Sequence, residues 1–265
     1  MPVFKFAALA VGLLFTAAAA PAEPATPSKP TIVLVHGAFA DSNSWNGVVA
    51  ELRRDGYPVV SAANPLRGAS SDAAYVSSIV KSINGPVVLV GHSYGGTVIT
   101  EAGYGVSNVK ALVYVSAFAP DVGESSFELA GKFPGSVLNT VLAPPVTTPE
   151  GKQDLYIRTD QFAASFAGDL PADVATIAAF AQRPLTLQAG EEKVGVTAWK
   201  AIPSWFIYGS KDLAIPPASL KFMAERAKSR KIVVIPGASH DLFRPDRGAY
   251  PRAMLEFVAR RAPGT

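Results

Sequence analysis

Apolar residues follow two alternating patterns along this chain. Short runs dominated by valine, isoleucine, leucine and aromatic residues are typical of strands buried on both faces of a parallel sheet. Such runs occupy residues 31–35, 57–62, 87–90, 109–115, 203–208 and 231–235. Between many of them, apolar side chains recur at every third or fourth position, as on one face of a helix. The alternation predicts an α/β fold with a doubly wound, mainly parallel sheet.

Helices are expected where the three-to-four-residue spacing occurs. They span residues 44–54, 71–83, 97–102, 217–227 and 250–261. Ser44 is placed to cap the first of these helices. Ser71 or Asp72 begins the second, and Asn84-Gly85 ends it.

Between about residues 120 and 200 the strand pattern stops. Pro, Gly, Thr and Ala are frequent there, and no clear buried strand is visible. We interpret this segment as helices and loops that form a cap over the sheet edge, inserted before the penultimate strand. Of its large apolar residues, we expect at least half to form the core of the cap and the rest to line an apolar pocket. These residues are Phe127, Leu129, Phe133, Leu138, Phe162, Phe166, Phe180 and Trp199.

The first 22 residues have the pattern of a secretory signal peptide. Lys5 supplies a positive start, residues 6–20 are apolar, and Ala20-Pro21-Ala22 offers small residues for cleavage after Ala22. A retained anchor and a buried helix are the alternatives, but the apolar run is shorter than the roughly 20 residues of a spanning helix. We therefore expect a secreted or periplasmic protein without a stable membrane anchor.

These segments divide the chain into five parts. A signal peptide (1–22) and a linker rich in Pro, Ala and Ser (23–30) precede the first part of the α/β core (31–119). The cap (120–200) follows, and the second part of the core (201–265) completes the chain.

Composition narrows the class of protein further. The 265 residues are 49% hydrophobic and 17% charged, which is typical of a globular protein. The net charge is +3, but Lys and Arg are spread along the chain, so no nucleic-acid partner is expected. The absence of cysteine excludes disulfides, cysteine-bound metals and a thiol nucleophile. No metal-ligand spacing, Gly-x-Gly-x-x-Gly or Walker lysine is found, so we expect neither a metal nor a cofactor.

The sequence Gly91-His92-Ser93-Tyr94-Gly95 directly follows the apolar run 87–90. A serine between two glycines at a strand-to-helix turn is the signature of a nucleophile elbow. The glycines remove Cβ atoms that would collide in the tight turn, and the serine oxygen lies exposed at the helix N-terminus. His36-Gly37 and Ser116 also follow strands, so we expect them beside Ser93 at the carboxyl edge of the sheet, where ligands bind. Ser93 is the candidate nucleophile.

A serine hydroxyl becomes an effective nucleophile when a base takes its proton. Of the three histidines, His240 follows the last strand in a glycine-containing loop and can reach the carboxyl edge, whereas we interpret His36 and His92 as structural hydrogen-bonding residues. The imidazole needs a carboxylate on its other nitrogen. Asp212, just after the penultimate strand, is the favoured acid, and Asp121, after the preceding strand, is the alternative.

Two backbone N–H groups are needed to stabilise the oxyanion that forms at an attacked carbonyl. One belongs to the residue after the nucleophile, Tyr94. The other is expected from the loop after the first strand, where Ala38 is the simplest choice and Phe39 the alternative. Gly37 allows this backbone to approach closely.

These stretches resemble the α/β-hydrolase superfamily. More narrowly, they resemble the branch that holds plant methyl esterases, hydroxynitrile lyases and bacterial pyrethroid-hydrolase-like esterases. The similar segments are residues 33–39, 90–96, 113–121, 211–216 and 236–240, in the order of the family. The resemblance implies that Ser93, Asp212 and His240 form the catalytic triad and that Ala38 and Tyr94 form the oxyanion hole.

The resemblance also implies an activity. It is that of a serine hydrolase that cleaves small carboxylic esters through an acyl-enzyme, with a small-molecule ester carrying an apolar part as its partner. Gly37 and Asp241 stand where the hydroxynitrile lyases have threonine and lysine, which favours ester hydrolysis. A hydroxynitrile lyase, a cofactor-free haloperoxidase or a C–C hydrolase on the same triad is the alternative. A non-catalytic small-molecule binder comes after these, because fold does not fix function.

Overall fold

The computed structural model describes Met1 and residues 29–242 of the chain. Six parallel strands form the central sheet in the order β2-β1-β3-β4-β8-β9. They are β1 (Thr31–Val35), β2 (Val59–Ala62), β3 (Val87–His92), β4 (Val109–Val115), β8 (Ser204–Gly209) and β9 (Lys231–Ile235). The chain leaves β1 in one direction to form β2 and then crosses to the other side to form β3. This reversal makes the carboxyl ends of β1 and β3 the switch point of the sheet, where ligands bind in such folds.

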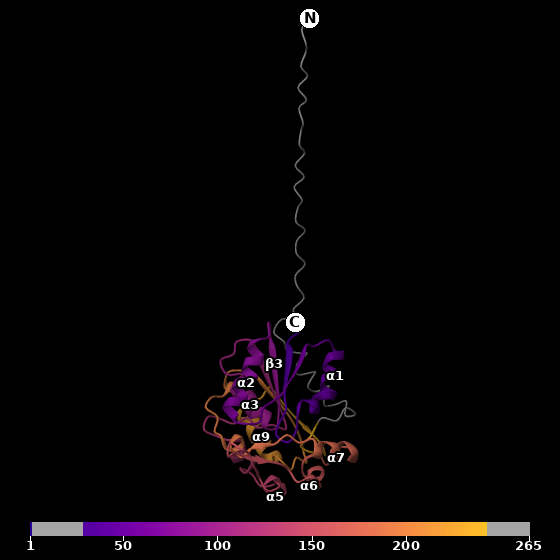
Figure 1. The fold of residues 1–265 in the computed structure, drawn as a ribbon. Coiled ribbons are helices and arrows are strands. Elements are labelled where there is room, and N and C mark those ends of the chain that lie inside the picture. The colour runs from indigo at the N-terminus through magenta and orange to yellow at the C-terminus, as the bar shows by residue number, and fades with distance from the viewer. Residues whose placement is uncertain (2–28, 243–265) are drawn as a thin grey trace.

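Helices cover both faces of the sheet (Figure 1). On one face lie α2 (Ala69–Lys81), α3 (Tyr94–Ala102) and α9 (Pro217–Arg226), and on the other lie the short 3-10 helix η1 (Ser42–Trp45) and α1 (Asn46–Arg54). Alternate residues of β1 enter the two cores: Val33 and Val35 pack on the first face, and Ile32 and Leu34 on the second. The strand is apolar throughout for this reason. The predicted doubly wound sheet is confirmed.

The starts of two helices differ from the prediction. In place of a first helix capped by Ser44, the 3-10 helix η1 comes first and is capped by Asp41, whose side chain accepts the Asn43 N–H at 2.8 Å; α1 then begins at Asn46. The second begins at Ala69, two residues before Ser71, because its N-terminus is closed by Asp72, whose carboxylate accepts the N–H of Arg67 at 3.1 Å. Acceptors in the first turn satisfy N–H groups that have no partner within the helix.

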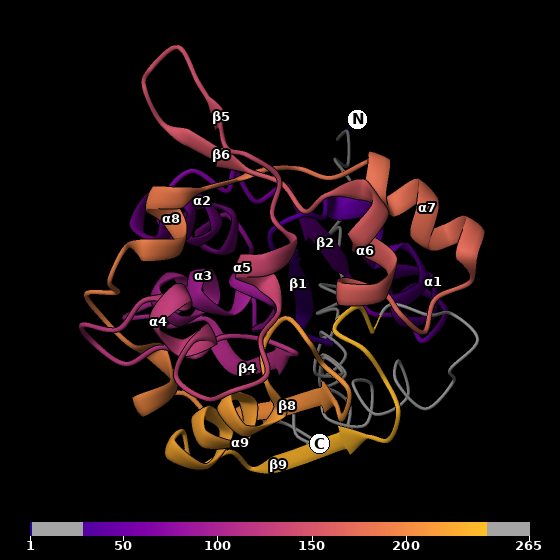
Figure 2. The same ribbon diagram turned by 90° about the horizontal axis from the view of Figure 1, so that it is seen from below.

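The cap lies between β4 and β8 in sequence and at one end of the sheet in space (Figures 1 and 2). Its helices are α4 (Ser126–Ala130), α5 (Leu138–Val141), α6 (Thr159–Phe166), α7 (Ala172–Phe180), α8 (Leu187–Glu191) and η2 (Ala198–Lys200). A small antiparallel sheet joins β5 (Val146–Thr147), β6 (Gln153–Leu155) and β7 (Leu185–Thr186). The expectation of a cap without buried strands is wrong, because β7 is wholly buried. A strand of two or three residues leaves no apolar run to recognise.

Polar contacts join the cap to the core, and two of them involve arginines. Arg67, after β2, donates to Asp154 of β6 at 2.7 Å, and the Thr186 hydroxyl of β7 donates to the Arg67 carbonyl at 3.1 Å. On the opposite side, Arg226 of α9 donates to Glu124 at 2.7 Å. The cap is thus attached both to the loop after β2 and to the end of α9.

Several predictions lie outside the described residues. They are the signal peptide (1–22), nearly all of the linker (23–30) and the closing helix (250–261). Among the residues that the structure describes, no helix is long and apolar enough to cross a membrane.

Candidate active site

Ser93 occupies a strained turn between β3 and α3. Its φ of 52° and ψ of −124° lie outside the regions that a non-glycine residue normally adopts, and such strain is concentrated at functional sites. A Cβ atom at Gly91 would lie 2.5 Å from the Gly95 carbonyl oxygen. One at Gly95 would lie 2.9 Å from the His36 carbonyl oxygen and closer still to that of Val35. The two glycines are therefore required for β3 and α3 to meet at this angle.

The start of α3 and the loop after β1 both adjoin Ser93. Tyr94 is the first residue of α3, so its N–H has no acceptor within the helix. Gly37 lies directly against Ser93, because a Cβ atom there would be 2.6 Å from the Ser93 Cβ. The Phe39 N–H donates to the Arg183 carbonyl at 3.0 Å. This bond occupies the alternative donor and favours Ala38.

The side chain of Tyr94 holds the nucleophile elbow in place through a buried hydrogen bond. Its hydroxyl donates to the Asp72 carboxylate at 2.9 Å, and both residues are buried. Burial and the neighbouring Asp72 raise the pKa of the Tyr94 hydroxyl well above its usual value, so the hydroxyl keeps its proton and acts as a donor. The bond fixes the start of α3 against the start of α2.

Asp212 and His240 come together at the same edge of the sheet. The His240 Nδ1 lies 2.8 Å from Asp212 Oδ2, and both side chains are fully buried. The other carboxylate oxygen, Oδ1, accepts the N–H groups of Ala214 at 2.9 Å and Ile215 at 2.8 Å. A carboxylate held in this way places the proton on Nδ1 and leaves Nε2 as the acceptor. Within the described residues the buried Nε2 has no hydrogen-bond partner.

His240 is packed between the elbow and the cap. Its ring centroid lies 4.8 Å from that of His92, and the His92 Nε2 lies 3.2 Å from the His240 carbonyl oxygen, to which it donates. Burial lowers the pKa of His92 well below its usual value, so His92 is neutral. On the other side, the Phe166 ring lies 4.6 Å from His240 and its carbonyl accepts the Asp241 N–H at 2.9 Å. The Ser239 hydroxyl donates to Asp169.

Phe166 and Asp169 are therefore residues of this site that the sequence pattern did not reveal. Phe166 was predicted only as one of the apolar residues of the cap. It contacts the base, and its ring also lies edge-on to Phe39, 6.2 Å away, on the loop that follows β1. No spacing in the sequence relates α6 to a loop that follows β9, so the contact is visible only in three dimensions.

The alternative acid, Asp121, lies elsewhere. Its carboxylate forms an ion pair with Lys200 and accepts the Val122 N–H at 2.7 Å. The structure brings Asp212 rather than Asp121 to His240.

His36 holds the loop after β1 against the end of β2. Its Nδ1 donates to the Gly37 carbonyl at 2.9 Å, and its Nε2 accepts the Asn64 N–H at 3.1 Å. The Asn64 amide in turn donates to the His36 carbonyl at 2.9 Å. Burial lowers the pKa of His36 from 6.5 to about 4, so the ring is neutral at physiological pH.

This shift predicts how stability depends on pH. Between pH 6.5 and about 4 the unfolded chain protonates His36 but the folded chain does not, so the free energy of unfolding falls as pH is lowered. One such group contributes ~1.4 kcal/mol per pH unit, or about 3 kcal/mol over the whole window. Urea unfolding at a series of pH values should give a smaller slope for His36→Gln, which keeps a donor and an acceptor. Parallel curves for the two proteins would contradict the assignment.

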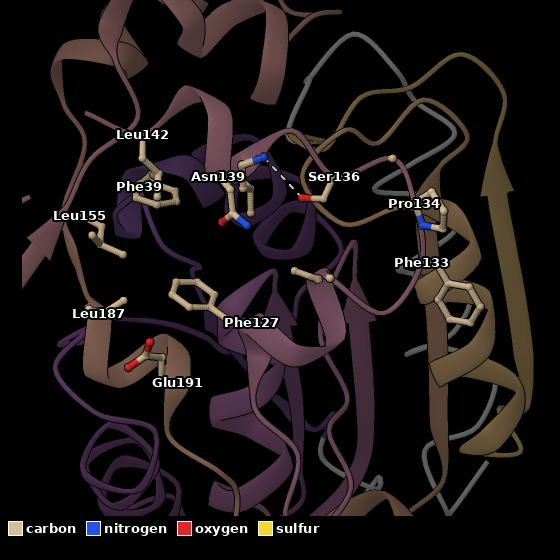
Figure 3. A pocket seen from close by; sticks show the side chains of 14 residues that line it. Phe39, Phe127, Phe133, Pro134, Ser136, Asn139, Leu142, Leu155, Leu187 and Glu191 are labelled. Carbon is tan, nitrogen blue, oxygen red and sulfur yellow. Dashed lines mark hydrogen bonds between the residues drawn. The ribbon is translucent and has the colours of Figure 1, made fainter. Parts of the chain in front are cut away.

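A cavity of about 540 Å³ lies among the cap elements, with the loop after β1 forming one part of its wall (Figure 3). Phe39, one residue beyond Ala38, forms part of its wall. Most of its other large side chains are apolar. They are Phe127, Phe133, Leu138, Leu142, Leu155 and Leu187, with Ser136, Asn139 and Glu191 as the polar members. The volume lies within the range of small-molecule sites.

Seven of the eight large apolar residues singled out in the cap are either buried or line the cavity. Phe127, Phe133 and Leu138 line the cavity. Leu129, Phe162, Phe166 and Trp199 are buried in the core. Phe180 is 77% exposed and lies outside this cavity, beside Tyr156 and Ile157 in the lining of a separate hollow. It lies at the end of α7, whose sequence is apolar on all sides and so gave no sign of which face is exposed.

Comparison with known proteins agrees with this geometry. The "Probable hydrolase R7" of Phoma sp. is 30% identical over 205 residues, which cover 72% of this chain and 80% of that protein. The "Pyrethroid hydrolase" of Sphingobium wenxiniae is 27% identical over 225 residues, covering 79% of this chain and 80% of that protein.

Among solved structures, polyneuridine aldehyde esterase has the same fold. Its TM-score is 0.74 at 20% sequence identity, and the match covers 87% of this chain and 99% of that one. These similarities confirm the predicted branch. The sequence model of the alpha/beta hydrolase family matches residues 32–253. The chain is therefore an enzyme of the α/β-hydrolase family.

Proposed function

We propose that this enzyme is a serine hydrolase that cleaves small carboxylic esters through an acyl-enzyme, with Ser93, His240 and Asp212 as its triad. The observation that carries the proposal is the buried hydrogen bond of 2.8 Å between Asp212 and His240, formed beside the strained Ser93 elbow. A neutral imidazole held by a carboxylate is the base that a serine nucleophile needs.

Each group has a defined part in the reaction. His240 Nε2 takes the proton of Ser93 Oγ as that oxygen attacks the ester carbonyl, and Asp212 stabilises the resulting imidazolium. The N–H groups of Tyr94 and Ala38 stabilise the oxyanion, where one donor typically contributes ~10^2 to 10^3 in rate. His240 then gives its proton to the departing alkoxide, which leaves as the alcohol. A water molecule, deprotonated by His240, attacks the acyl-enzyme; as the Ser93–acyl bond breaks, His240 returns the proton to Ser93 Oγ and the acid is released.

The cavity supports an ester with an uncharged apolar part. Its lining is dominated by Phe and Leu side chains, and it begins at Phe39, next to the proposed oxyanion donor Ala38. The names of two similar proteins, a pyrethroid hydrolase and polyneuridine aldehyde esterase, point to the same type of reaction.

A fluorophosphonate probe tests the proposal, because it phosphonylates only an activated serine. We expect one label per chain, on the tryptic peptide 82–110, which lies between Lys81 and Lys110. Fragmentation should place the label on Ser93 rather than on Ser82 or Ser107 of that peptide. Hydrolysis of 4-nitrophenyl acetate should fall in proportion to the labelled fraction, and Ser93→Ala should take up no label.

Two results would contradict this proposal. One is a label on another serine, or full ester hydrolysis by the labelled protein. The other is turnover of a cyanohydrin or a β-diketone without turnover of any ester, which would indicate a lyase or a C–C hydrolase on the same residues.

A further inference from the structure

We propose that Phe127, seated on Gly190, limits how far the apolar group of the substrate enters the cavity, and that the substrate is an uncharged ester with a medium-length or aryl group. The inference rests on the proposed esterase function, whose substrate class it specifies. It is carried by the contact between α4 and α8, which forms one wall of the cavity (Figure 3).

The ring of Phe127 lies directly on the backbone of Gly190. A Cβ atom at Gly190 would be 2.5 Å from Phe127 Cε2 and 2.7 Å from Cε1, and closer still to Cζ. Such distances exclude any side chain at this position unless the ring moves. Figure 3 shows the Phe127 ring reaching across the cavity toward the helix that carries Leu187 and Glu191.

Gly190 is not required by the backbone. It lies inside α8, it is buried, and its φ is outside the left-handed region that favours glycine. A glycine within a helix costs roughly 0.5–1 kcal/mol relative to alanine. Since the backbone conformation does not require glycine here, we infer that position 190 is a glycine because a larger residue would leave no room for the Phe127 ring. The position of the ring is thus fixed by α8 beneath it.

The Phe39 wall of the cavity is fixed as well. Phe39 has a φ of 60°, and its N–H is bonded to the Arg183 carbonyl at 3.0 Å. Its ring therefore forms a stationary wall one residue from Ala38. Phe39 and Phe127 line the same cavity, so we infer that an apolar group extending from a carbonyl at Ser93 passes Phe39 and meets the Phe127 ring.

The chemistry of the wall selects against charge. Leu142, Leu155 and Leu187 offer no partner to an ion, and burying an unpaired charge among such groups is costly. Glu191, the acidic residue of the lining, would repel a carboxylate on the substrate. A medium-length alkyl or aryl group, by contrast, can pack against this apolar wall without a polar partner. The cavity thus fits a neutral ester and not the half-ester of a dicarboxylic acid.

Two homologous ester series test the proposal. One is 4-nitrophenyl esters with acyl chains of two to twelve carbons, and the other is acetates of alcohols of rising length, followed with a pH indicator. In Phe127→Ala the ratio of kcat/KM between long and short esters should rise by about tenfold, and in Gly190→Ala it should fall, because the displaced ring fills the cavity. The series that responds identifies the acyl or the alcohol group as the occupant. A 4-nitrophenyl hemisuccinate should be a poor substrate for the unmodified enzyme.

The control is Phe180→Ala, which removes an exposed cap aromatic outside this cavity and should leave both series unchanged. Thermal unfolding provides a second readout. Gly190→Ala should lower Tm, and the double variant Phe127→Ala/Gly190→Ala should recover part of the loss because the clash is relieved. This measurement remains informative even if Gly190→Ala is poorly folded.

The outcomes separate the two proposals. Unchanged length ratios in Phe127→Ala, in an enzyme that hydrolyses esters through Ser93, would overturn the role of Phe127 alone. Efficient turnover of the hemisuccinate would overturn the substrate class. Absence of Ser93-dependent ester hydrolysis in the unmodified enzyme would overturn the proposed function and this inference with it.

Discussion

Asp212→Asn should lower kcat for 4-nitrophenyl acetate by ~10^4-fold while the protein stays folded. The direction of the new amide is set by the structure. Asp212 Oδ1 accepts the N–H groups of Ala214 and Ile215, so the asparagine oxygen keeps that side and its NH₂ group faces His240. His240 Nδ1 must then accept a hydrogen bond, and the ring proton moves to Nε2. A base that carries its proton on the nitrogen facing the serine cannot deprotonate it.

The three residues should act as a unit. Ser93→Ala is expected to reduce kcat by ~10^4-fold or more, and Ser93→Ala/Asp212→Asn should be no slower than Ser93→Ala alone. Steady-state kinetics on the three variants, with circular dichroism to confirm folding, measure this non-additivity. Independent, multiplicative losses would show that Asp212 acts in some other way.

Asp121→Asn is the matched control for the acid. It removes the ion pair with Lys200, whereas His240 is bonded to Asp212, and should leave kcat within about twofold. If this variant lost activity and Asp212→Asn kept it, the two carboxylates would have to exchange roles.

The parts of the fold that could be predicted are those encoded over a few neighbouring residues. Apolar runs gave the six strands of the sheet, because a strand buried on both faces must be apolar at nearly every position. Gly91, Ser93 and Gly95 could be recognised for the same reason: their constraints act within one turn. The roles of His240 and Asp212 could be predicted from the topology, because both residues follow strands whose carboxyl ends lie at the same edge of the sheet.

What could not be predicted depends on contacts between distant segments. Nothing local to Phe166 indicates that its ring lies against His240, or that the Arg183 carbonyl takes the Phe39 N–H. The strands β5 to β7 are too short to leave a periodic pattern. These features share one origin: the cap is built from short elements whose positions are set by the core beneath them.

Gly95→Ala should strongly destabilise the enzyme. The new methyl group would lie 2.9 Å from the His36 carbonyl oxygen and closer still to that of Val35. Both are backbone atoms at the end of β1, which is held in register by β2 on one side and β3 on the other. A flexible side chain could move away, but a strand paired on both edges cannot. Overpacking costs typically 1–3 kcal/mol, and against this backbone we expect about 3 kcal/mol or more.

Differential scanning calorimetry measures the effect, which corresponds to a fall in Tm on the order of 10 °C for a protein of this size. Gly195→Ala is the control, because its methyl group would have Glu101 Oε1, 3.8 Å away, as its nearest neighbour. The Gly95 variant should also lose most of its kcat at temperatures where it is still folded. The methyl group presses on the loop that carries Ala38, so relief of the clash moves the proposed oxyanion donor away from Ser93. Unchanged Tm and kcat in the Gly95 variant would contradict this prediction, because they would show that there is room for a methyl group between α3 and the end of β1.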